Sequence, residues 1–417
     1  MIERALVEAV LRDVISACDP ATRVRDALGE PSIAAHLAGR PRLAVAIGKA
    51  ALAMARGAGE VARGIAVVPR GAGGKLPPGW QLLEASHPEP DEHSVATGAA
   101  VLGLVRAARE TDAVLALLSG GASALAEQPI IGLAEFVATI RAVMAAGAAI
   151  DEINAVRSAL SAIKAGQLAL ASAAPVITLA VSDVIGDPLA VIGSGPTIGP
   201  WLASPGVAVD DGSAGRRARA RAVLERLGLP APAVLAGDSP ARTVARSDLA
   251  AVIAPMASAG RAGVTALAAR GIAATLVEAP IAGEVEGVAR MLASAPVAGG
   301  QAALVAWGEP TLRLPAPHGV GGRAQQLALV LARWLRGTGR SALVVGTDGV
   351  DGPPPPDRTA PAGAWVDGAT WDAIAAAGHD PAAALAACDA GTALAAVGAL
   401  VVTGPSGINH ADLVILG

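Results

Sequence analysis

The stretch "DAVLALLSGGAS", residues 112–123, joins a run of apolar residues to a glycine-rich turn. The run is short and uninterrupted, a pattern typical of a strand that is buried on both faces of a sheet. Helical spacing of apolar residues follows the turn, at Leu133, Phe136, Ile140 and Met144. A strand, a glycine turn and a helix in this order indicate one βα unit of a parallel sheet.

The same pattern recurs along the chain, which predicts an α/β fold with a parallel sheet. Further strand candidates lie at residues 42–47, 64–68, 81–86, 176–181, 250–255, 273–278, 301–307 and 342–345. We expect helices at the amino terminus, over about 152–172 and from 322 to 334. The loop and charged helix start at 194–220 are too long for a simple connection, so we place the domain boundary shortly after them and predict domains at 1–230 and 231–417.

Composition excludes several classes of function. The 417 residues carry 32 basic and 36 acidic side chains, and this near-neutral balance does not favour binding to nucleic acid or to an anionic membrane. No window of about 18 apolar residues lacks Gly, Pro or charge, so we expect no transmembrane helix. Cys18 and Cys388 fit no metal or disulfide spacing. We therefore expect a cytoplasmic enzyme that acts on a small molecule, as a monomer or homodimer.

Glycine-rich polar segments follow several of the predicted strands. Because ligands bind outside the carboxyl ends of strands in open α/β sheets, we expect these segments to share one site. In "SGGAS", Gly120 and Gly121 would let backbone amides converge on a phosphate, while Ser119 and Ser123 add hydroxyl groups. An ordinary turn is the alternative. The chain has neither a Walker A motif nor Gly-x-Gly-x-x-Gly after its first strand, which disfavours a dinucleotide-dependent reductase.

Two pairs of carboxylates lie in such segments. Asp183 and Asp187 belong to "SDVIGD", and Asp348 and Asp351 belong to "GTDGVDG". Mg²⁺ takes one or two carboxylates and leaves its other positions to water and phosphate oxygens, so the pairs predict a Mg²⁺–phosphate site. The alternative is that these are turn aspartates bonded to their own backbone.

Basic and polar side chains complete the candidate site. Lys49 begins a helix in apolar surroundings, and Arg323 stands at a helix start, where a cation is favourable only if an anion binds there too. On the helix predicted at 152–172, spacing places four side chains in one polar stripe: Asn154, Arg157, Ser161 and Lys164. The alternative is that this stripe is simply the solvated face of the helix. His87 lies in a proline-rich loop, where a structural role is the favoured interpretation of a histidine.

Eight segments, in order along residues 40–415, resemble the glycerate 2-kinase family, whose members have a C-terminal MOFRL domain and are often labelled hydroxypyruvate reductases. These segments are "VAIGKAALAMA", "SHPEPDEHS", "LLSGGASAL", "INAVRSALSAIKAGQLA", "SDVIGDPLAVIGSGPT", "GGRAQQLAL", "GTDGVDGPPPPDRTAPAGAWVD" and "TGPSGINHADL". The resemblance implies a Rossmann-like N-terminal domain, a smaller C-terminal domain and an active site in the cleft. It also implies Mg²⁺-dependent transfer of the ATP γ-phosphoryl group to the 2-hydroxyl of D-glycerate.

Roles follow from the resemblance residue by residue. Lys49 and Arg323 match the family's essential basic positions, "SGGAS" matches its phosphate loop, and the aspartates match its acidic motifs. The expected roles are catalysis by Lys49, Arg323, Asp183 and Asp348; cofactor binding by Ser119, Gly120, Gly121, Ser123 and Gly322; substrate binding by Asn154, Arg157, Lys164 and His87; and metal binding by Asp187 and Asp351.

The sequence departs from the family mainly near the acceptor. The family usually has Val-Arg-Lys-His-Leu-Ser, Lys-Gly-Gly, Gly-Gly-Arg-Asn-Gln-Glu and Thr-Gly-Thr-Asn-Val where this chain has "VRSALS", "KAG", "GGRAQQ" and "SGINHA". The usual Asp after "SGPT" is replaced by "GPWLASPG". A kinase for another small hydroxy acid and a catalytically silent nucleotide-binding homologue are therefore the alternative hypotheses.

Overall fold

The computed structural model describes residues 2–203, 209–210, 213–236, 243–244, 247–296, 302–353 and 359–417. Parts of the predicted loop at 194–220 and of the proline run at 353–356 lie outside these residues. The chain divides into two compact units, Pro20–Ala254 and Met1–Asp19 with Pro255–Gly417. We call them the parallel-sheet unit and the mixed-sheet unit.

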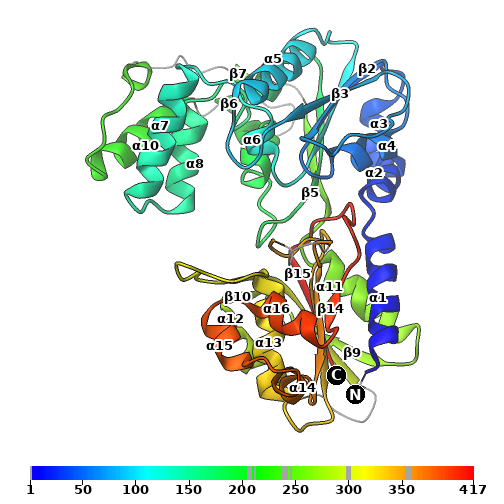
Figure 1. Ribbon diagram of the computed structural model, residues 1–417. Coiled ribbons are helices and arrows are strands. Elements are labelled where there is room, and N and C mark those ends of the chain that lie inside the picture. Colours follow the sequence, from blue (N-terminus) through cyan, green and yellow to red (C-terminus); the bar gives the residue numbers. More distant parts are fainter. Residues whose placement is uncertain are drawn as a thin grey trace. The chain divides into compact units, whose positions relative to one another are not determined.

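The parallel-sheet unit contains six strands in the order β3-β2-β1-β4-β5-β8, all paired in parallel (Figure 1). Strand order reverses between β1 and β4, as in Rossmann-like folds. This confirms the predicted α/β class. The strands are β1 (Arg42–Ile47), β2 (Arg63–Pro69), β3 (Trp80–Ala85), β4 (Ala113–Leu118), β5 (Val176–Val181) and β8 (Leu249–Ala254). A separate two-stranded ribbon joins β6 (Val209–Asp210) to β7 (Thr243–Val244).

Continuous apolar strands are explained by burial on both faces of this sheet. Val114, Ala116 and Leu118 of β4 pack into one cluster, whereas Leu115 and Leu117 pack into another.

Helices α7, α8 and α10 pack together on one side with an apolar cluster of their own (Figure 1). The helices are α2 (Pro20–Gly29), α3 (Pro31–Leu37), α4 (Ala51–Ala58), α5 (Glu92–Arg106), α6 (Ala122–Leu125), α7 (Leu133–Ala145), α8 (Ile150–Ala159), α9 (Gln167–Leu170) and α10 (Ser213–Arg226), with short 3₁₀ turns at Ile192–Ser194, Pro200–Ala203 and Ala233–Leu235.

The mixed-sheet unit is built on a seven-stranded sheet in the order β10-β11-β15-β12-β13-β14, with β9 also paired to β11. The central strand β15 is antiparallel to both of its neighbours. Its strands are β9 (Ala273–Leu276), β10 (Ile281–Glu284), β11 (Ala302–Thr311), β12 (Ser341–Gly346), β13 (Gly363–Asp367), β14 (Leu400–Val401) and β15 (Asp412–Leu416). Its helices are α1 (Arg4–Ala17), α11 (Ser258–Ala268), α12 (Val285–Ser294), α13 (Arg323–Leu335), α14 (Thr370–Ala376), α15 (Pro381–Ala386) and α16 (Ala390–Ala396).

The division of the chain differs from the predicted boundary at 230/231. Strand β8, which ends at Ala254, pairs with β5 and so extends the parallel sheet. The amino-terminal helix α1 packs against α11, and Ile2 N donates to Ser341 Oγ at 3.1 Å. Strand pairing and helix packing decide to which unit each segment belongs. The change in composition before residue 230 therefore does not coincide with the division between the two units.

The predicted continuous helix over 152–172 is wrong. Helix α8 ends at Ala159, and the backbone then bonds to a neighbouring segment, since Ile130 N donates to Leu160 O and Ala162 N donates to Gln128 O. Ala165 adopts a left-handed φ of 49°, which is incompatible with a continuing α-helix. The predicted polar stripe is therefore split between a helix and the segment after it.

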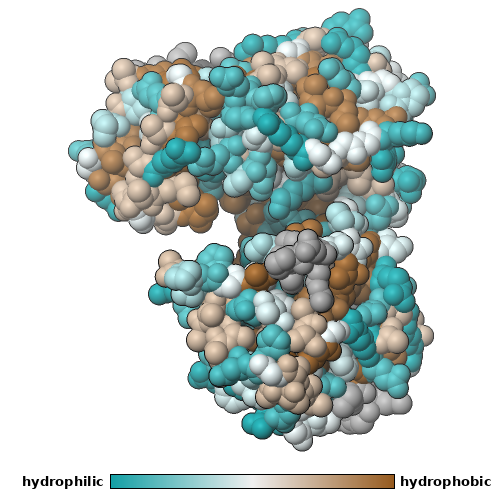
Figure 2. Space-filling model, viewed as in Figure 1, coloured by the Kyte–Doolittle hydropathy of each residue, from teal (hydrophilic) through white to brown (hydrophobic). Residues whose placement is uncertain are grey.

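Apolar and polar residues are interspersed over the face drawn in Figure 2. Within the described ranges, large exposed apolar side chains include Met144 and Ile150, near the turn between α7 and α8. Among those same ranges, no helix is both long and apolar enough to cross a membrane.

The unusual "GPWLASPG" segment supplies a core residue. Trp201 is 1% exposed and packs into the apolar cluster that contains Val176. Its Nε1 donates to Asp248 Oδ2 at 2.8 Å, while Asp248 Oδ1 accepts from Val176 N at 2.8 Å. Trp201 thereby helps to hold the first residue of β5 to Asp248, the residue before β8.

Replacing Trp201 with phenylalanine should destabilise the parallel-sheet unit. Phenylalanine keeps an aromatic ring but removes part of the buried indole and the donor to a buried carboxylate oxygen, so the free energy of unfolding should fall by about 1–3 kcal/mol. Urea denaturation followed by circular dichroism measures this change. An unchanged midpoint would show that the indole hydrogen bond contributes nothing to stability.

Candidate functional site

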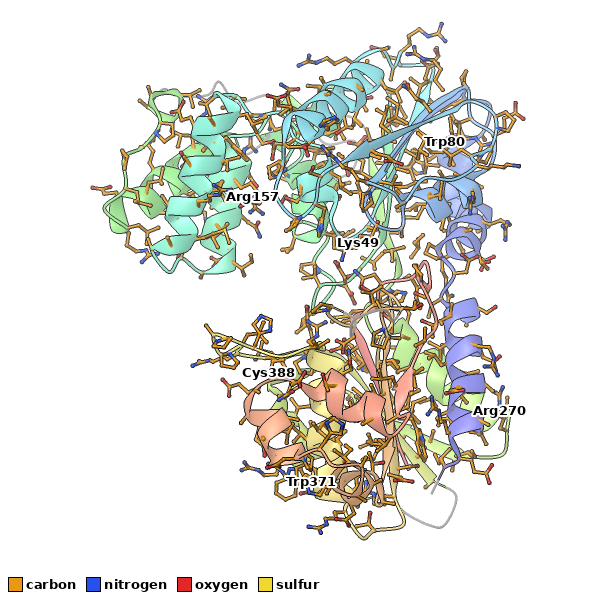
Figure 3. The ribbon with its side chains drawn as sticks, viewed as in Figure 1. Lys49, Trp80, Arg157, Arg270, Trp371 and Cys388 are labelled. Atoms are coloured by element: carbon orange, nitrogen blue, oxygen red, sulfur yellow. The ribbon has the colours of Figure 1, made fainter. Side chains whose placement is uncertain are left out.

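The carboxyl ends of β1 and β4 carry the first predicted site residues. Lys49 N donates to Gly120 O at 2.9 Å, and Ser119 Oγ accepts from Ala50 N at 3.1 Å. A Cβ on Gly48 would lie 2.1 Å from Ser119 Oγ, so any larger residue would push the two segments apart. These bonds join the start of α4 to the predicted phosphate loop and leave the Lys49 side chain exposed (Figure 3).

Asp183 and His87 lie against the same loop. A Cβ on Gly120 would be 1.9 Å from Asp183 Oδ2, which means that the carboxylate packs directly over this glycine. A Cβ on Gly121 would be 3.1 Å from His87 Cδ2 and 3.4 Å from Lys49 Cγ. Partial burial, together with the Lys49 charge, lowers the pKa of His87, which favours the neutral imidazole. The fold thus brings a lysine, a carboxylate and a histidine to one loop.

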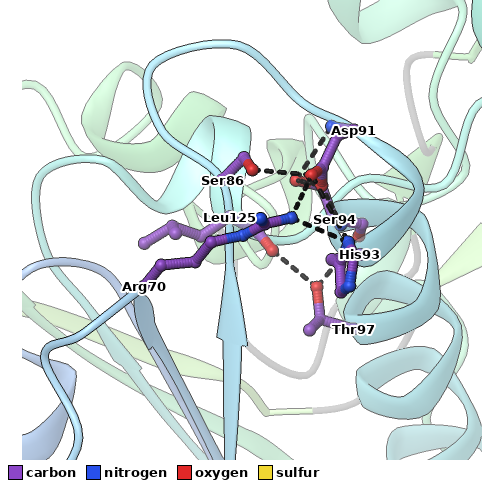
Figure 4. Close-up of polar contacts among 7 residues, drawn as sticks. All are labelled: Arg70, Ser86, Asp91, His93, Ser94, Thr97 and Leu125. Carbon is purple, nitrogen blue, oxygen red and sulfur yellow. Dashed lines mark hydrogen bonds and ion pairs between the residues drawn. The ribbon is translucent and has the colours of Figure 1, made fainter.

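A network around Asp91 holds the segment that carries His87 (Figure 4). Asp91 is the N-cap of α5 and accepts from Ser94 N at 3.0 Å. Ser86 Oγ and Arg70 Nη2 each donate to its Oδ2 at 2.6 Å. Although burial alone would raise the pKa of Asp91, these contacts hold it well below its usual range. The "SHPEPDEHS" motif is therefore largely a helix-capping structure that fixes the position of His87.

Lys164, predicted to bind substrate, is enclosed behind the phosphate loop. Its Nζ donates to Ser123 O at 2.7 Å and pairs with Glu127 Oε2 at 2.6 Å. Ser161 Oγ donates to Glu127 Oε1 at 2.5 Å. Burial lowers the pKa of Lys164, while the Glu127 carboxylate acts in the opposite direction. With side chains only 1% and 0% exposed, Lys164 and Glu127 support Ser123 from inside and do not offer Lys164 to a ligand.

Arg157 remains available on α8. Burial lowers its pKa, and the charge of Glu127 offsets this only in part. Among the described residues, Arg157 has no hydrogen-bond or ion-pair partner. Asn154 lies half-buried one turn earlier on the same helix. A desolvated guanidinium without a partner is costly, which makes Arg157 a favourable contact for an anion.

In the mixed-sheet unit, two carboxylates hold Arg323. Its Nε and Nη2 donate to Asp412 Oδ2 and Oδ1 at 2.7 and 3.2 Å, a bidentate pair. Its Nη1 donates to Glu309 Oε1 at 2.6 Å. Burial alone would lower the pKa of Arg323, but the two carboxylates raise it above the ordinary value. Burial raises the pKa of Asp412 to about 7.

Asp351 caps α13, at the start of which Arg323 stands. Its Oδ1 accepts from Ala324 N at 3.0 Å, and its Oδ2 accepts from Gln325 N at 2.8 Å. A Cβ on Gly322 would lie 2.3 Å from Asp351 Oδ1, so glycine is needed for this approach. Burial raises the pKa of Asp351, and the two backbone bonds counteract it. Both oxygens accept hydrogen bonds from the start of α13, so Asp351 acts as a helix cap against which Gly322 packs. The metal contact of Asp351 and the cofactor contact of Gly322 stay predictions.

The remaining acidic candidates lie in turns. Asp348 Oδ1 accepts from Val350 N at 3.1 Å. Asp187 is half-buried and has a left-handed φ of 53° in the turn after β5. Across the residues that the structure describes, no three His, Cys, Asp or Glu side chains gather as a metal cluster.

Sequence reasoning did not single out three carboxylates that organise these sites, Glu127, Glu309 and Asp412. Each is an isolated acidic residue beside an apolar run, in "ALAEQP", "VAWGEP" and "HADLVIL". A lone charge next to buried sequence is the available signal, because it requires a cation or donor at the same depth.

Comparisons with known proteins place this geometry in a family. The chain matches a family described as a domain of unknown function, DUF4147, over residues 6–205 and the MOFRL family over residues 302–412. A Thermotoga maritima protein named D-glycerate 2-kinase is 35% identical over 353 residues, 81% of this chain and 79% of that protein. An Agrobacterium vitis protein, provisionally named hydroxypyruvate reductase, is 35% identical over 430 residues, 96% of this chain and 94% of that protein.

A crystal structure of glycerate kinase from Thermotoga maritima has a TM-score of 0.86 and 32% identity, and the match covers 99% of this chain and 98% of that one. The fold and the two matched regions define an enzyme class in which a DUF4147 domain precedes a MOFRL domain. Within that class, the chain belongs to the glycerate 2-kinase family. The family resemblance of the sequence motifs is thereby confirmed.

Replacing Lys164 with methionine should destabilise the parallel-sheet unit, because Glu127 would stay buried without its cation. We expect the free energy of unfolding, measured by urea denaturation, to fall by about 3–5 kcal/mol. The double variant K164M/E127Q removes both charges and should regain much of this loss. A double variant as unstable as K164M would contradict the buried-pair assignment.

Proposed function

We propose that the protein is an ATP-dependent glycerate 2-kinase that converts D-glycerate and ATP to 2-phosphoglycerate and ADP. Relatives named as glycerate kinases, similar along most of the chain, support this activity. The observation that carries the proposal is the convergence of Lys49, Asp183 and the loop at 119–123. They meet where the strand order reverses between β1 and β4, the usual ligand position in such sheets.

The phosphate loop and two cations would hold and neutralise the phosphoryl groups. The backbone amides at Gly120 and Gly121 lie in a turn that can form an anion-binding concavity, and the exposed Lys49 amino group adds positive charge. Arg323 would stabilise the charge on the transferring group. Phosphoryl transfer requires mainly positioning and charge neutralisation, which these groups provide.

The acceptor would be held from α8. We assign the glycerate carboxylate to Arg157, whose half-buried charge has no partner among the described residues. Asn154, one turn earlier on α8, and His87, against the phosphate loop, are proposed as further polar contacts of the substrate. Asp183 is our choice to orient or deprotonate the 2-hydroxyl because it packs over Gly120. Asp348 is less favoured because one of its oxygens already accepts from Val350 N.

The carboxylates after β5 suit Mg²⁺, which prefers oxygen ligands. We assign Asp187 to the metal, beside Asp183 on the same segment. Mg²⁺ would neutralise phosphate oxygens and so favour attack by the hydroxyl. Asp351 is left out of this assignment, since its oxygens accept from the amides that begin α13.

An enolase-coupled assay tests the proposal directly. Purified protein is mixed with Mg-ATP and D-glycerate, and phosphoenolpyruvate is followed in the presence of enolase without phosphoglycerate mutase. A signal is expected, and it would establish both the kinase activity and phosphorylation at the 2-position. Because enolase itself uses Mg²⁺, the metal requirement of the kinase is measured separately as ADP release from ATP and glycerate, which omission of Mg²⁺ should abolish.

Other outcomes separate the alternatives. ADP release with other hydroxy acids but not with glycerate would retain the kinase and change its substrate. Binding of ATP in calorimetry without turnover on any acceptor would favour a silent homologue. Oxidation of NADH or NADPH with hydroxypyruvate would contradict the proposal and support the reductase name that one relative carries.

Replacing Arg157 with alanine should weaken the binding of glycerate specifically. Loss of a charge-assisted contact with the carboxylate is expected to raise the KM for glycerate roughly 10- to 100-fold and to leave the KM for ATP nearly unchanged. Arg157→Lys is the matched control, because it keeps the charge and loses the planar fork. A change confined to the KM for ATP would move Arg157 to the nucleotide.

A further inference from the structure

We propose that Asp412 is a positioning residue that sets the orientation of the Arg323 guanidinium and influences phosphoryl transfer only through it. This inference rests on the proposed kinase function, in which Arg323 stabilises the transferring group. It adds a residue that none of the predicted site motifs assigns to a role.

The backbone of Asp412 is held rigidly. It is the first residue of β15, the strand between β11 and β12, and it lies opposite Gly308 on one side and Gly346 on the other. Its side chain is 3% exposed. A carboxylate on a central, doubly paired strand is a more fixed reference point than one on a loop.

The contacts of Arg323 bind some N–H groups of its guanidinium and leave others without a partner among the described residues. Nε and Nη2 both bond to Asp412, which fixes the plane of the group, and Nη1 bonds to Glu309. An arginine has five N–H groups, so two remain, and neither has an acceptor within the described ranges. The side chain is 31% exposed, so these two N–H groups, one on each Nη, can be offered to an anion while Asp412 holds the Nε–Nη2 edge.

The Asp412 side chain is buried more deeply than that of Glu309, so the two carboxylates should contribute differently to holding Arg323. Glu309 is 49% exposed, and solvent weakens an exposed ion pair. Asp412 is nearly buried and binds in a bidentate manner, and electrostatic interaction is stronger where water is excluded. The orientation of Arg323 should therefore depend on Asp412 more than on Glu309.

The test is a double-mutant cycle on the full-length protein in the glycerate kinase assay. Asp412→Asn should lower kcat about 100-fold, the loss expected from a small misplacement, with little change in either KM. R323A should lower kcat about 1,000-fold, and R323A/D412N should be no slower than R323A. E309Q should lose less activity than D412N.

Asp367→Asn is the structural control, because Asp367 lies on β13 of the same sheet and accepts from Ala369 N at 3.0 Å, but has no bond to Arg323 within the described ranges and stands at the other end of its strand from the Arg323 side. It should shift the melting temperature and leave kcat unaltered. A D412N variant that loses no more kcat than D367N would overturn the proposal. So would a further loss of kcat when D412N is added to R323A.

Melting temperatures test the same coupling without any substrate. R323A leaves the Asp412 carboxylate buried without its cation, so the melting temperature should fall, and adding D412N should restore part of the loss. Absence of that recovery would overturn the pairing on which the inference rests. A wild-type enzyme that fails to phosphorylate glycerate would refute the proposed function, whereas the melting temperatures would still decide whether Asp412 fixes Arg323.

Discussion

The parallel pairing of β1 with β4 is the constraint on which the candidate nucleotide site depends. Ile47 lies opposite Leu118, so both strands end at the same level and their following segments begin side by side. Gly48 then approaches Ser119 more closely than any side chain would permit. Because the sheet fixes this approach, the lysine after β1 and the glycine loop after β4 lie side by side, as a shared ligand site requires.

Buried carboxylates support the cations around both candidate sites. Glu127 compensates Lys164 and faces Arg157, while Asp412 holds Arg323. An unpaired charge at this depth would be strongly unfavourable, so each carboxylate fixes its partner in one geometry. Arg157 differs from the other two cations, since its compensation is only partial. That residual cost can be relieved by an anionic ligand, which is why α8 is a better acceptor-binding element than the segment that follows it.

Sequence alone predicted the strands well, because strands buried on both faces leave continuous apolar runs such as "AVLALL". It failed where tertiary bonds override local periodicity, as after Ala159, where backbone groups bond to the segment at 128–130. The capping role of Asp351 was also hidden, because an aspartate in a glycine turn has the same local pattern whether it binds a metal or a helix start. The carboxylates Glu127 and Asp412 act through distant partners, a relation that spacing cannot reveal.

The departures from the family pattern fall largely on structural positions. Ser158 and Ala159, where the family usually has Lys-His, are buried, and Ala159 packs into the core shared by α7, α8 and α10. Gln326 replaces the usual Glu and donates from Nε2 to Leu385 O at 2.9 Å, a bond that a carboxylate could not make. Trp201, from the segment "GPWLASPG" that replaces the usual Asp, fills the core. Because these changes lie in the interior and leave Arg157 in place, they do not by themselves argue for an acceptor other than the proposed one.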